Sequence, residues 1–279
     1  MSNVLLFNLT TVLFGVASLL YLVSLYAKNE QIAVYGTWTC VLAVVTSTAA
    51  LGVRWYESYQ MGIGRIPVTN LYESLVFFAW SVNIFYLIIE KRYGSRTFGA
   101  FVMPIAFFTM LFAVTNDSSI QPLVPALQSY WLHAHVITCF VGYAAFAVSA
   151  GIAVMFLLKN RQEAENVSAG IVGRLPSGKT LDDLVYRAII WGFPFLTAGI
   201  ITGAAWANYA WGTYWSWDPK ETWSLIVWIV YAIYLHARIT RGWHGKRTAI
   251  LSIVGFAATL FCYLGVNLVL SGLHSYGGG

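Results

Sequence analysis

Apolar segments of about 20 residues recur along almost the whole chain, and a helix needs about that length to cross the hydrocarbon core of a bilayer. Only 10% of the residues are charged, against about 25% in soluble domains. The sequence therefore predicts an all-α polytopic protein of the lipid bilayer, with residues 1–279 forming a single integral membrane domain. We count eight transmembrane segments, at residues 4–27, 32–53, 70–90, 97–115, 129–158, 185–208, 221–240 and 248–270.

Two prolines, Pro104 and Pro194, fall inside predicted helices. Neighbouring helices can satisfy the backbone groups that a proline frees in a membrane, so neither proline changes the prediction. The first apolar run, residues 4–26, is long enough to span and is followed by no small-residue cleavage pattern. We therefore expect it to be a transmembrane helix and not a signal peptide.

Lysine and arginine are divided unequally between the connecting segments. Of the 16 such residues, 13 fall in four segments: 28–30, 90–97, 159–187 and 238–247. The positive-inside rule places these segments in the cytoplasm or the stroma, and both termini on the outer, periplasmic or lumenal, side. The protein is then expected in the bacterial cytoplasmic (inner) membrane or in the thylakoid membrane. The net charge of +5 therefore indicates membrane topology and not nucleic-acid binding. We expect residues 159–184 to form a solvated internal loop.

Residues 206–223, WANYAWGTYWSWDPKETW, form the densest aromatic stretch of the chain. Five of the 12 tryptophans lie here: Trp206, Trp211, Trp215, Trp217 and Trp223. Indole rings are rigid and flat, with an apolar body and a polar edge, so an external loop of this composition can build a flat-walled site at the membrane surface. The alternative is an interfacial aromatic belt, although belts are spread over many helix ends.

The acidic end of this stretch has a structural interpretation. Asp218 precedes Pro219 and the predicted seventh helix, so it can be the helix N-cap, with Glu221 as a favourable acid in the first turn. We expect both acids to fix the loop to the helix more than to contact a ligand.

Histidines from different helices converge on the same outer face. His133 and His135 begin the fifth helix, and His274 follows the eighth. Neutral imidazole is a common metal ligand, and two on opposite sides suit the axial positions of a haem iron. The alternative is that they bond only to water or headgroups. Because His133 and His135 are two residues apart on a helix, their side chains point about 200° from each other, so only one can face a common site. The spacing does not show which one does, although His135 lies deeper in the helix.

His236 is predicted to lie within the bilayer, roughly 20 Å below Trp223 on the seventh helix. An intramembrane titratable residue is a functional-site hypothesis by default. It could ligate a second haem in transit, relay protons or bond to a neighbouring helix. A six-coordinate iron at His236 would need a ligand from a partner subunit. Arg238 and Arg241 could pair with haem propionates, but we expect them to mark the membrane edge.

The three cysteines, Cys40, Cys139 and Cys262, are each isolated in an apolar run. The absence of CxxC and CxxCH excludes a dithiol redox site and a c-type cytochrome. Any haem bound here is therefore expected to be haem b, held non-covalently through histidine.

The tryptophan stretch resembles the WWD segment of haem-handling membrane proteins, with the core WGTYWSWDPKE at 211–221. Three further segments are similar to those of the CcsA (ResC) family of system II cytochrome c biogenesis proteins. They are GRIPVTNLYESLVFFAW at 64–80, SYWLHAHVITCFVGYAAF at 129–146 and SGLHSYG at 271–277. The resemblance covers the chain from about residue 54 to its end.

The resemblance implies roles for particular residues. His135 and His274 look like the axial iron ligands on the outer face, with His133 a bystander. His236 matches a histidine that the family links to a transmembrane haem site, where it would be a further iron ligand. The WWD positions are occupied by Trp211, Trp215, Trp217, Asp218 and Glu221. The outer cations Arg54, Arg65 and Lys220 are candidates for contacts to haem propionates.

The implied function is to carry haem or present it at the outer face for covalent thioether attachment to the CxxCH of apocytochrome c. The chain would be a subunit of a cytochrome c synthase (haem lyase) complex with a CcsB/ResB-type membrane partner. Two alternatives remain. One is a haem exporter that delivers to a haem chaperone, and the other is a transporter whose aromatic loop cages an organic cation.

Overall fold

The computed structural model describes residues 2–164 and 172–270, and the regular elements of these residues are all helical. Eight helical stretches in the described part are long and apolar enough to cross a membrane. The prediction of an all-α polytopic membrane protein is therefore confirmed, while the side on which the termini lie stays a prediction. The helices are α1 Ser2–Ala27, α2 Glu30–Gln60, α3 Leu71–Tyr93, α4 Gly99–Val114, α5 Tyr130–Ala164, α6 Gly178–Trp211, α7 Pro219–Thr240, α8 Lys246–Leu260 and α9 Val266–Val269.

Short helical turns complete the described elements. Three are 3₁₀ turns, at Arg96–Phe98, Pro125–Leu127 and Val172–Arg174. A π-helical segment, Phe261–Gly265, joins α8 to α9 without a break in the helix. Pro104 lies inside α4 and Pro194 inside α6, so both prolines are accommodated within continuous helices as expected.

Several helices extend beyond the apolar runs that predicted them. Helix α2 continues to Gln60. The two ends of the predicted loop 159–184 are helical, because α5 extends to Ala164 and α6 begins at Gly178. The apolar run marks the part of a helix that can lie in hydrocarbon, whereas polar residues that form helices well can prolong it into water. Within α6, for example, Arg187 pairs with Asp183 one turn earlier, at 2.6 Å.

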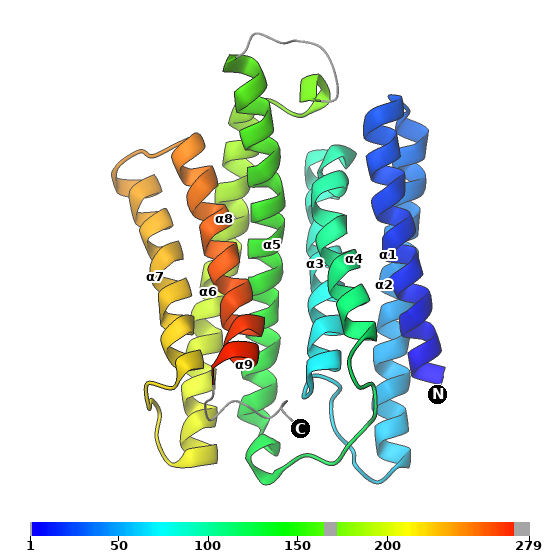
Figure 1. Cartoon of the computed structure of the whole chain (residues 1–279), viewed down its shortest axis with the longest axis vertical. Helices are drawn as coiled ribbons and strands as arrows, with labels where there is room; N and C mark the ends of the chain where they lie inside the picture. Colours follow the sequence, from blue (N-terminus) through cyan, green and yellow to red (C-terminus); the bar gives the residue numbers. More distant parts are fainter. Residues whose placement is uncertain (1, 165–171, 271–279) are drawn as a thin grey trace. The chain divides into compact units, whose positions relative to one another are not determined.

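The chain packs as two compact units, and the single membrane domain stays a prediction. Unit 1 comprises residues 1–122 and 158–177, and unit 2 comprises residues 123–157 and 178–279. Unit 1 contains α1 to α4, with α1 beside α2 and α3 beside α4 (Figure 1). Unit 2 contains most of α5 together with α6 to α9.

A buried ion cluster holds one end of unit 1 together. Glu73, in the first turn of α3, accepts from Arg54 Nε of α2 at 2.8 Å and from Arg65 Nη1 at 2.7 Å. The Glu73 side chain is fully buried, and those of Arg54 and Arg65 are nearly so. Arg54 also donates to the backbone carbonyls of Ser118 and Ser119, beyond α4. The cluster therefore ties two loops and two helices to one carboxylate.

Unit 2 contains a close approach of α5 to α6 that depends on glycine. A Cβ at Gly192 would lie 2.6 Å from the Phe146 ring, and one at Gly142 would lie 3.1 Å from Gly192 O. A Cβ at Gly199 would lie 2.5 Å from Cys139 Sγ. Small residues at such positions let membrane helices pack backbone against backbone. The stripe of glycines thus brings the two helices into direct contact along several turns.

A second buried carboxylate lies at the end of unit 2 where α7 is joined to α8. Asp182, near the start of α6, accepts from Arg238 Nη1 at 2.5 Å and from Gly245 N at 2.9 Å. Thr248 Oγ1 donates to the same side chain at 3.1 Å. Because these donors come from α7, from α8 and from the loop between them, Asp182 fixes that loop against α6.

Replacing Glu73 with glutamine should destabilise the protein by about 3–5 kcal/mol, since it leaves two buried guanidinium groups without a counter-charge. The measurement is the free energy of unfolding of the detergent-purified protein. Asp183→Asn is the matched control, because it breaks the exposed Arg187 pair and should cost only about 0.3–0.5 kcal/mol. Equal effects of the two substitutions would show that the buried cluster does not hold unit 1 together.

Candidate functional site

The tryptophan stretch is mostly helical, and its loop is shorter than the predicted 206–223. Trp206 and Trp211 lie in the last turns of α6, and Trp223 lies in the first turns of α7. Only Gly212–Asp218 remains between the helices. Helix α6 continues because alanine and tryptophan are compatible with it, and α7 begins at Pro219, which has the backbone angle that a first helical position requires. The loop lies at the lower end of α6 and α7 in Figure 1.

The two acids form a capping box at the start of α7. Asp218 is the N-cap, and its side chain accepts from Lys220 N at 2.9 Å. Glu221 Oε2 reaches back to accept from Asp218 N at 3.1 Å and from Ser216 N at 2.7 Å. This arrangement satisfies backbone donors on both sides of the helix start. The expectation that the acids fix the loop to the helix is confirmed by this geometry.

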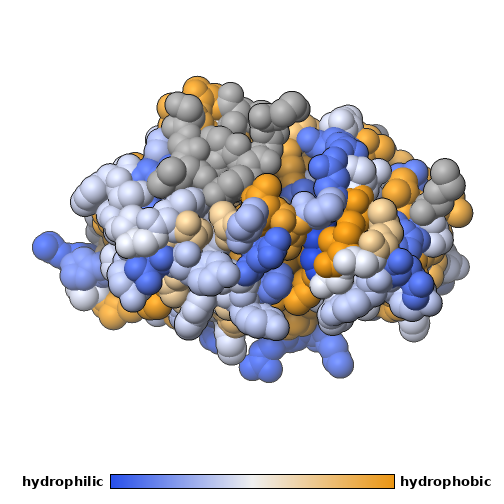
Figure 2. Space-filling view, turned by 90° about the horizontal axis from the view of Figure 1, so that it is seen from below, coloured by the Kyte–Doolittle hydropathy of each residue, from blue (hydrophilic) through white to orange (hydrophobic). Residues whose placement is uncertain are grey.

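Trp215 and Trp217 are presented by the loop itself. Their rings are perpendicular, with centroids 5.6 Å apart, and Trp217 is 69% exposed. Trp217 has a φ of 60°, a left-handed conformation that is an outlier for a bulky residue. The surrounding hydrogen bonds hold this strained conformation, as Thr222 Oγ1 donates to Trp217 O at 3.3 Å. The face seen from below mixes hydrophilic and hydrophobic residues (Figure 2).

His135 is held on α5 by a contact that selects its tautomer. Its Nδ1 lies 2.7 Å from Gly199 O on α6. A carbonyl oxygen can only accept, so Nδ1 carries the proton and Nε2 keeps its lone pair. Among the described residues, Nε2 has no hydrogen-bond partner. A backbone carbonyl bonded to one ring nitrogen is the usual second-shell arrangement of a histidine that binds metal through the other.

Aromatic rings pack against the same imidazole. The His135 ring stacks on Trp206, with centroids 6.0 Å apart and planes 19° apart. Trp206 also contacts Trp211, at 5.0 Å between centroids, and donates through Nε1 to Ala126 O at 2.8 Å. Among the predicted site residues, His135, Trp206 and Trp211 therefore form one continuous group.

Space for the imidazole is provided by a glycine on the facing helix. A Cβ at Gly203 would lie 2.6 Å from His135 Nδ1, so no larger residue fits there without moving the ring. Gly199 and Gly203 are one turn apart on α6, and they provide the hydrogen-bond acceptor and the space for the ring respectively. The sequence contained this signal as two glycines four residues apart in a membrane helix, but nothing linked them to His135.

His133, by contrast, has no hydrogen-bond partner in the described part of the chain. Both of its ring nitrogens are buried and lack hydrogen bonds to described residues. Its ring meets Tyr130 edge-on at 6.3 Å. His133 therefore lacks the second-shell bond that orients His135, which supports the choice between the two histidines that spacing left open.

Other predicted site residues lie apart from this group. Trp223 packs on Phe261, with centroids 4.3 Å apart. His236 is exposed on α7, and the 18 residues from Asp218 place it roughly 25 Å along the helix. His274 lies outside the described residues. Within residues 2–164 and 172–270, no three His, Cys, Asp or Glu side chains are grouped so that they could hold a metal ion.

The basic candidates are held by internal partners that sequence reasoning missed. Arg54 and Arg65, predicted as possible contacts for propionates, are buried on Glu73. Arg238, predicted to mark the membrane edge, is buried on Asp182 and lies over the Tyr186 ring at 5.0 Å. These partners are 8 to 56 residues away in the sequence. At such separations no local sequence pattern predicts an ion pair.

Comparison with known proteins gives a consistent result. The sequence profile described as cytochrome C assembly protein matches residues 68–274. The cytochrome c biogenesis protein CcsA of Synechococcus elongatus is 43% identical, over 87% of each chain. The CcsA proteins of Mesostigma viride and Synechocystis are 40% and 39% identical, and the matches cover 97% and 98% of this chain.

The solved structure of the cytochrome c heme lyase CcmF shares the fold. It matches with a TM-score of 0.71 at 18% sequence identity, over 93% of this chain. This chain spans 46% of that protein. The profile match and the close relatives show that this chain belongs to the cytochrome c assembly protein family, as an integral membrane protein of cytochrome c biogenesis.

Proposed function

We propose that this protein binds haem b non-covalently at the end of unit 2 that carries the tryptophan loop, and presents it to apocytochrome c. The observation that carries this proposal is the state of His135. Its Nδ1 proton is committed to Gly199 O at 2.7 Å, which leaves Nε2 as a lone-pair donor of fixed direction. A neutral imidazole nitrogen is a common metal ligand, and histidine is a usual axial ligand of haem iron.

The second axial ligand in this proposal is His274. Its support is the resemblance of SGLHSYG to the corresponding family segment, since it lies outside the described residues. Ligands from two separate chain segments suit a carrier, because one can leave the iron while the other still holds it. The histidine of the substrate CxxCH can then replace the ligand that leaves.

The tryptophans act as the surface on which the porphyrin lies. Trp206 and Trp211 border the His135 ring, and Trp215 and Trp217 extend the aromatic surface into the loop. Asp218 and Glu221 hold that loop through the capping box. The haem supplies the vinyl groups, and the protein's contribution is to orient and shield them while cysteine thiols of the substrate add to form thioethers.

We assign the protein to a cytochrome c synthase (haem lyase) complex with a CcsB/ResB-type membrane partner. Two other functions remain testable against this one. A haem exporter would co-purify with a small haem chaperone in place of that partner. A transporter of organic cations would show no visible absorption spectrum and would not need His135 or His274.

His135→Ala and His274→Ala should each abolish the bis-histidine absorption spectrum of haem in the purified protein, because each removes one axial ligand. His133→Ala is the matched control, two residues from His135, and should keep the spectrum. If the protein with both His135→Ala and His274→Ala retains all the haem, the ligand assignment is wrong.

Gly203→Ala should weaken haem binding, because the added Cβ displaces the His135 imidazole. Gly52→Ala is the control and should not weaken it, since its added Cβ meets no atom within 4 Å.

Asp218→Asn should keep both stability and haem binding, because asparagine caps helices about as well as aspartate. Asp218→Ala should lose about 0.5–2 kcal/mol of stability by removing the cap, and haem binding should fall with it. Unfolding and haem titration of the same samples measure both quantities. Loss of haem from a fully stable Asp218→Asn protein would indicate direct contact between the carboxylate and haem.

We further propose that His236 holds haem in transit within the bilayer. Its exposed position on α7 would let a partner subunit supply the second ligand. His236→Ala should reduce the haem that accumulates at the outer site in cells, while Ile233→Ala, on the same exposed face, should not. Equal haem occupancy of the two variants and the unaltered protein would exclude the transit role.

A further inference from the structure

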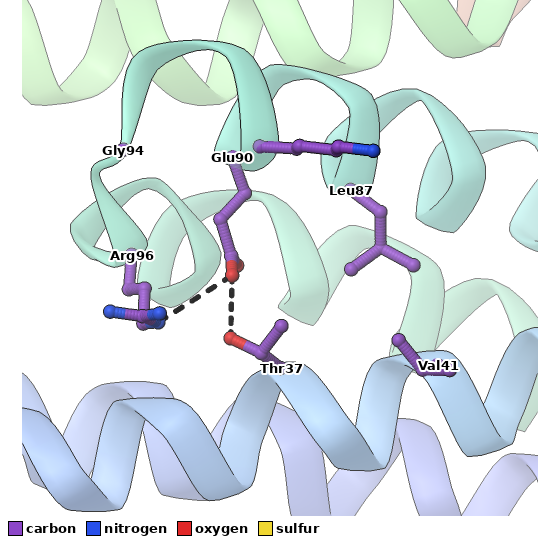
Figure 3. A pocket seen from close by; sticks show the side chains of 7 residues that line it. Thr37, Val41, Leu87, Glu90, Gly94 and Arg96 are labelled. Atoms are coloured by element: carbon purple, nitrogen blue, oxygen red, sulfur yellow. Dashed lines mark hydrogen bonds and ion pairs between the residues drawn. The ribbon is translucent and has the colours of Figure 1, made fainter.

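A cavity of about 380 Å³ lies in unit 1 beside the last turn of α3 (Figure 3). This volume is within the range of roughly 300–1,000 Å³ that is usual for small-molecule sites. One part of the wall is apolar, formed by Val41 and Leu87, and another is charged, formed by Glu90, Lys91 and Arg96. The lining therefore suits a ligand with one polar end and one apolar end.

The carboxylate in this wall is already satisfied by the protein. Glu90 Oε2 accepts from Tyr21 Oη at 2.8 Å and from Tyr86 Oη. Glu90 Oε1 accepts from Thr37 Oγ1 at 2.5 Å. Figure 3 shows Glu90 reaching from α3 toward Thr37 on α2, with Arg96 on its other side. Glu90 thus shapes the cavity, while its capacity to accept further hydrogen bonds is largely used.

Arg96, in contrast, has an unused donor. Its Nε is buried and has no hydrogen-bond acceptor in the described part of the chain. It forms an ion pair with Glu90 Oε1 at 3.7 Å, a distance too long for a hydrogen bond. Nη1 donates to Glu30 Oε1 at 2.9 Å, but the Glu30 side chain is 82% exposed, so this pair is weak. A buried N–H without an acceptor is costly. Because the Arg96 side chain is 32% exposed, the guanidinium can turn so that an oxygen atom of a ligand accepts from it.

The position of the cavity points to the source of that oxygen. Tyr35 and Trp38, next to Thr37 on α2, are 62% and 67% exposed. Exposed tyrosine and tryptophan at a helix end are typical of the headgroup level of a bilayer. Lys91, Arg92 and Arg96 collect at the same end of unit 1, and basic pockets between membrane helices at this level bind anionic lipid headgroups.

We propose that this cavity binds an anionic phospholipid. Phosphate oxygens accept from the partly exposed Arg96 guanidinium and from the Lys91 ammonium, and the glycerol and first methylenes lie against Val41 and Leu87. Free phosphate shares the oxygen chemistry but makes no use of the apolar wall. The lipid joins α2 to the 3₁₀ turn after α3, in addition to the bonds through Glu90.

Native mass spectrometry of the full-length protein, equilibrated with mixed phosphatidylglycerol and phosphatidylcholine, tests this site. The unaltered protein should retain phosphatidylglycerol in preference. Arg96→Gln should reduce that retention about five-fold, the effect of removing one basic residue near anionic lipid. Arg92→Gln is the matched control, because it removes a neighbouring charge that does not line the cavity, and it should retain clearly more phosphatidylglycerol than Arg96→Gln.

A second variant distinguishes loss of lipid binding from loss of folding. Val41→Trp fills the apolar wall while leaving Glu90 and Arg96 in place, and it should also displace phosphatidylglycerol. Equal retention by the unaltered protein and a folded Arg96→Gln protein overturns the proposal, and so does equal retention of the two lipids. If Arg96→Gln does not fold, the result with Val41→Trp decides. Complete displacement by excess inorganic phosphate at constant ionic strength would assign the site to free phosphate and also overturn the proposal.

Discussion

Buried carboxylates must find donors inside the protein, and this constraint organises both units. Charges within a membrane are costly unless they are paired. Glu73, Glu90 and Asp182 each lie near a helix end, and each collects donors from at least two other segments. These three side chains attach loops to particular helix ends, which an apolar core alone cannot do.

The glycine stripe between α5 and α6 has a related effect on the candidate site. Close approach of the backbones brings Gly199 O within 2.7 Å of His135 Nδ1, and the absence of a side chain at Gly203 leaves room for the ring. The orientation of His135 is therefore decided by the packing of two helices and not by the loop. Rigid elements hold functional groups more accurately than loops do, so the loop is left to provide aromatic surface.

The sequence predicted the features that depend on residues close together in the chain. Lengths of apolar runs predicted eight membrane helices, and the order Asp218-Pro219-x-Glu221 predicted the cap, because its partners are within three residues. It did not reach Arg54 and Glu73, or Arg238 and Asp182, whose pairing requires the tertiary fold. The bond from His135 to Gly199 spans 64 residues, so the sequence could nominate this histidine but not show how it is held.

The π-helical segment Phe261–Gly265 has a consequence for the chain beyond it. A π-bulge accommodates one extra residue within a helix, and each residue of an α-helix turns the chain by about 100°. The residues that follow Gly265 therefore leave α8 in a different angular phase from the one that an unbroken helix would give them. A natural or engineered deletion of one residue here would keep the helix but rotate α9 and Leu270 about the helix axis relative to α8.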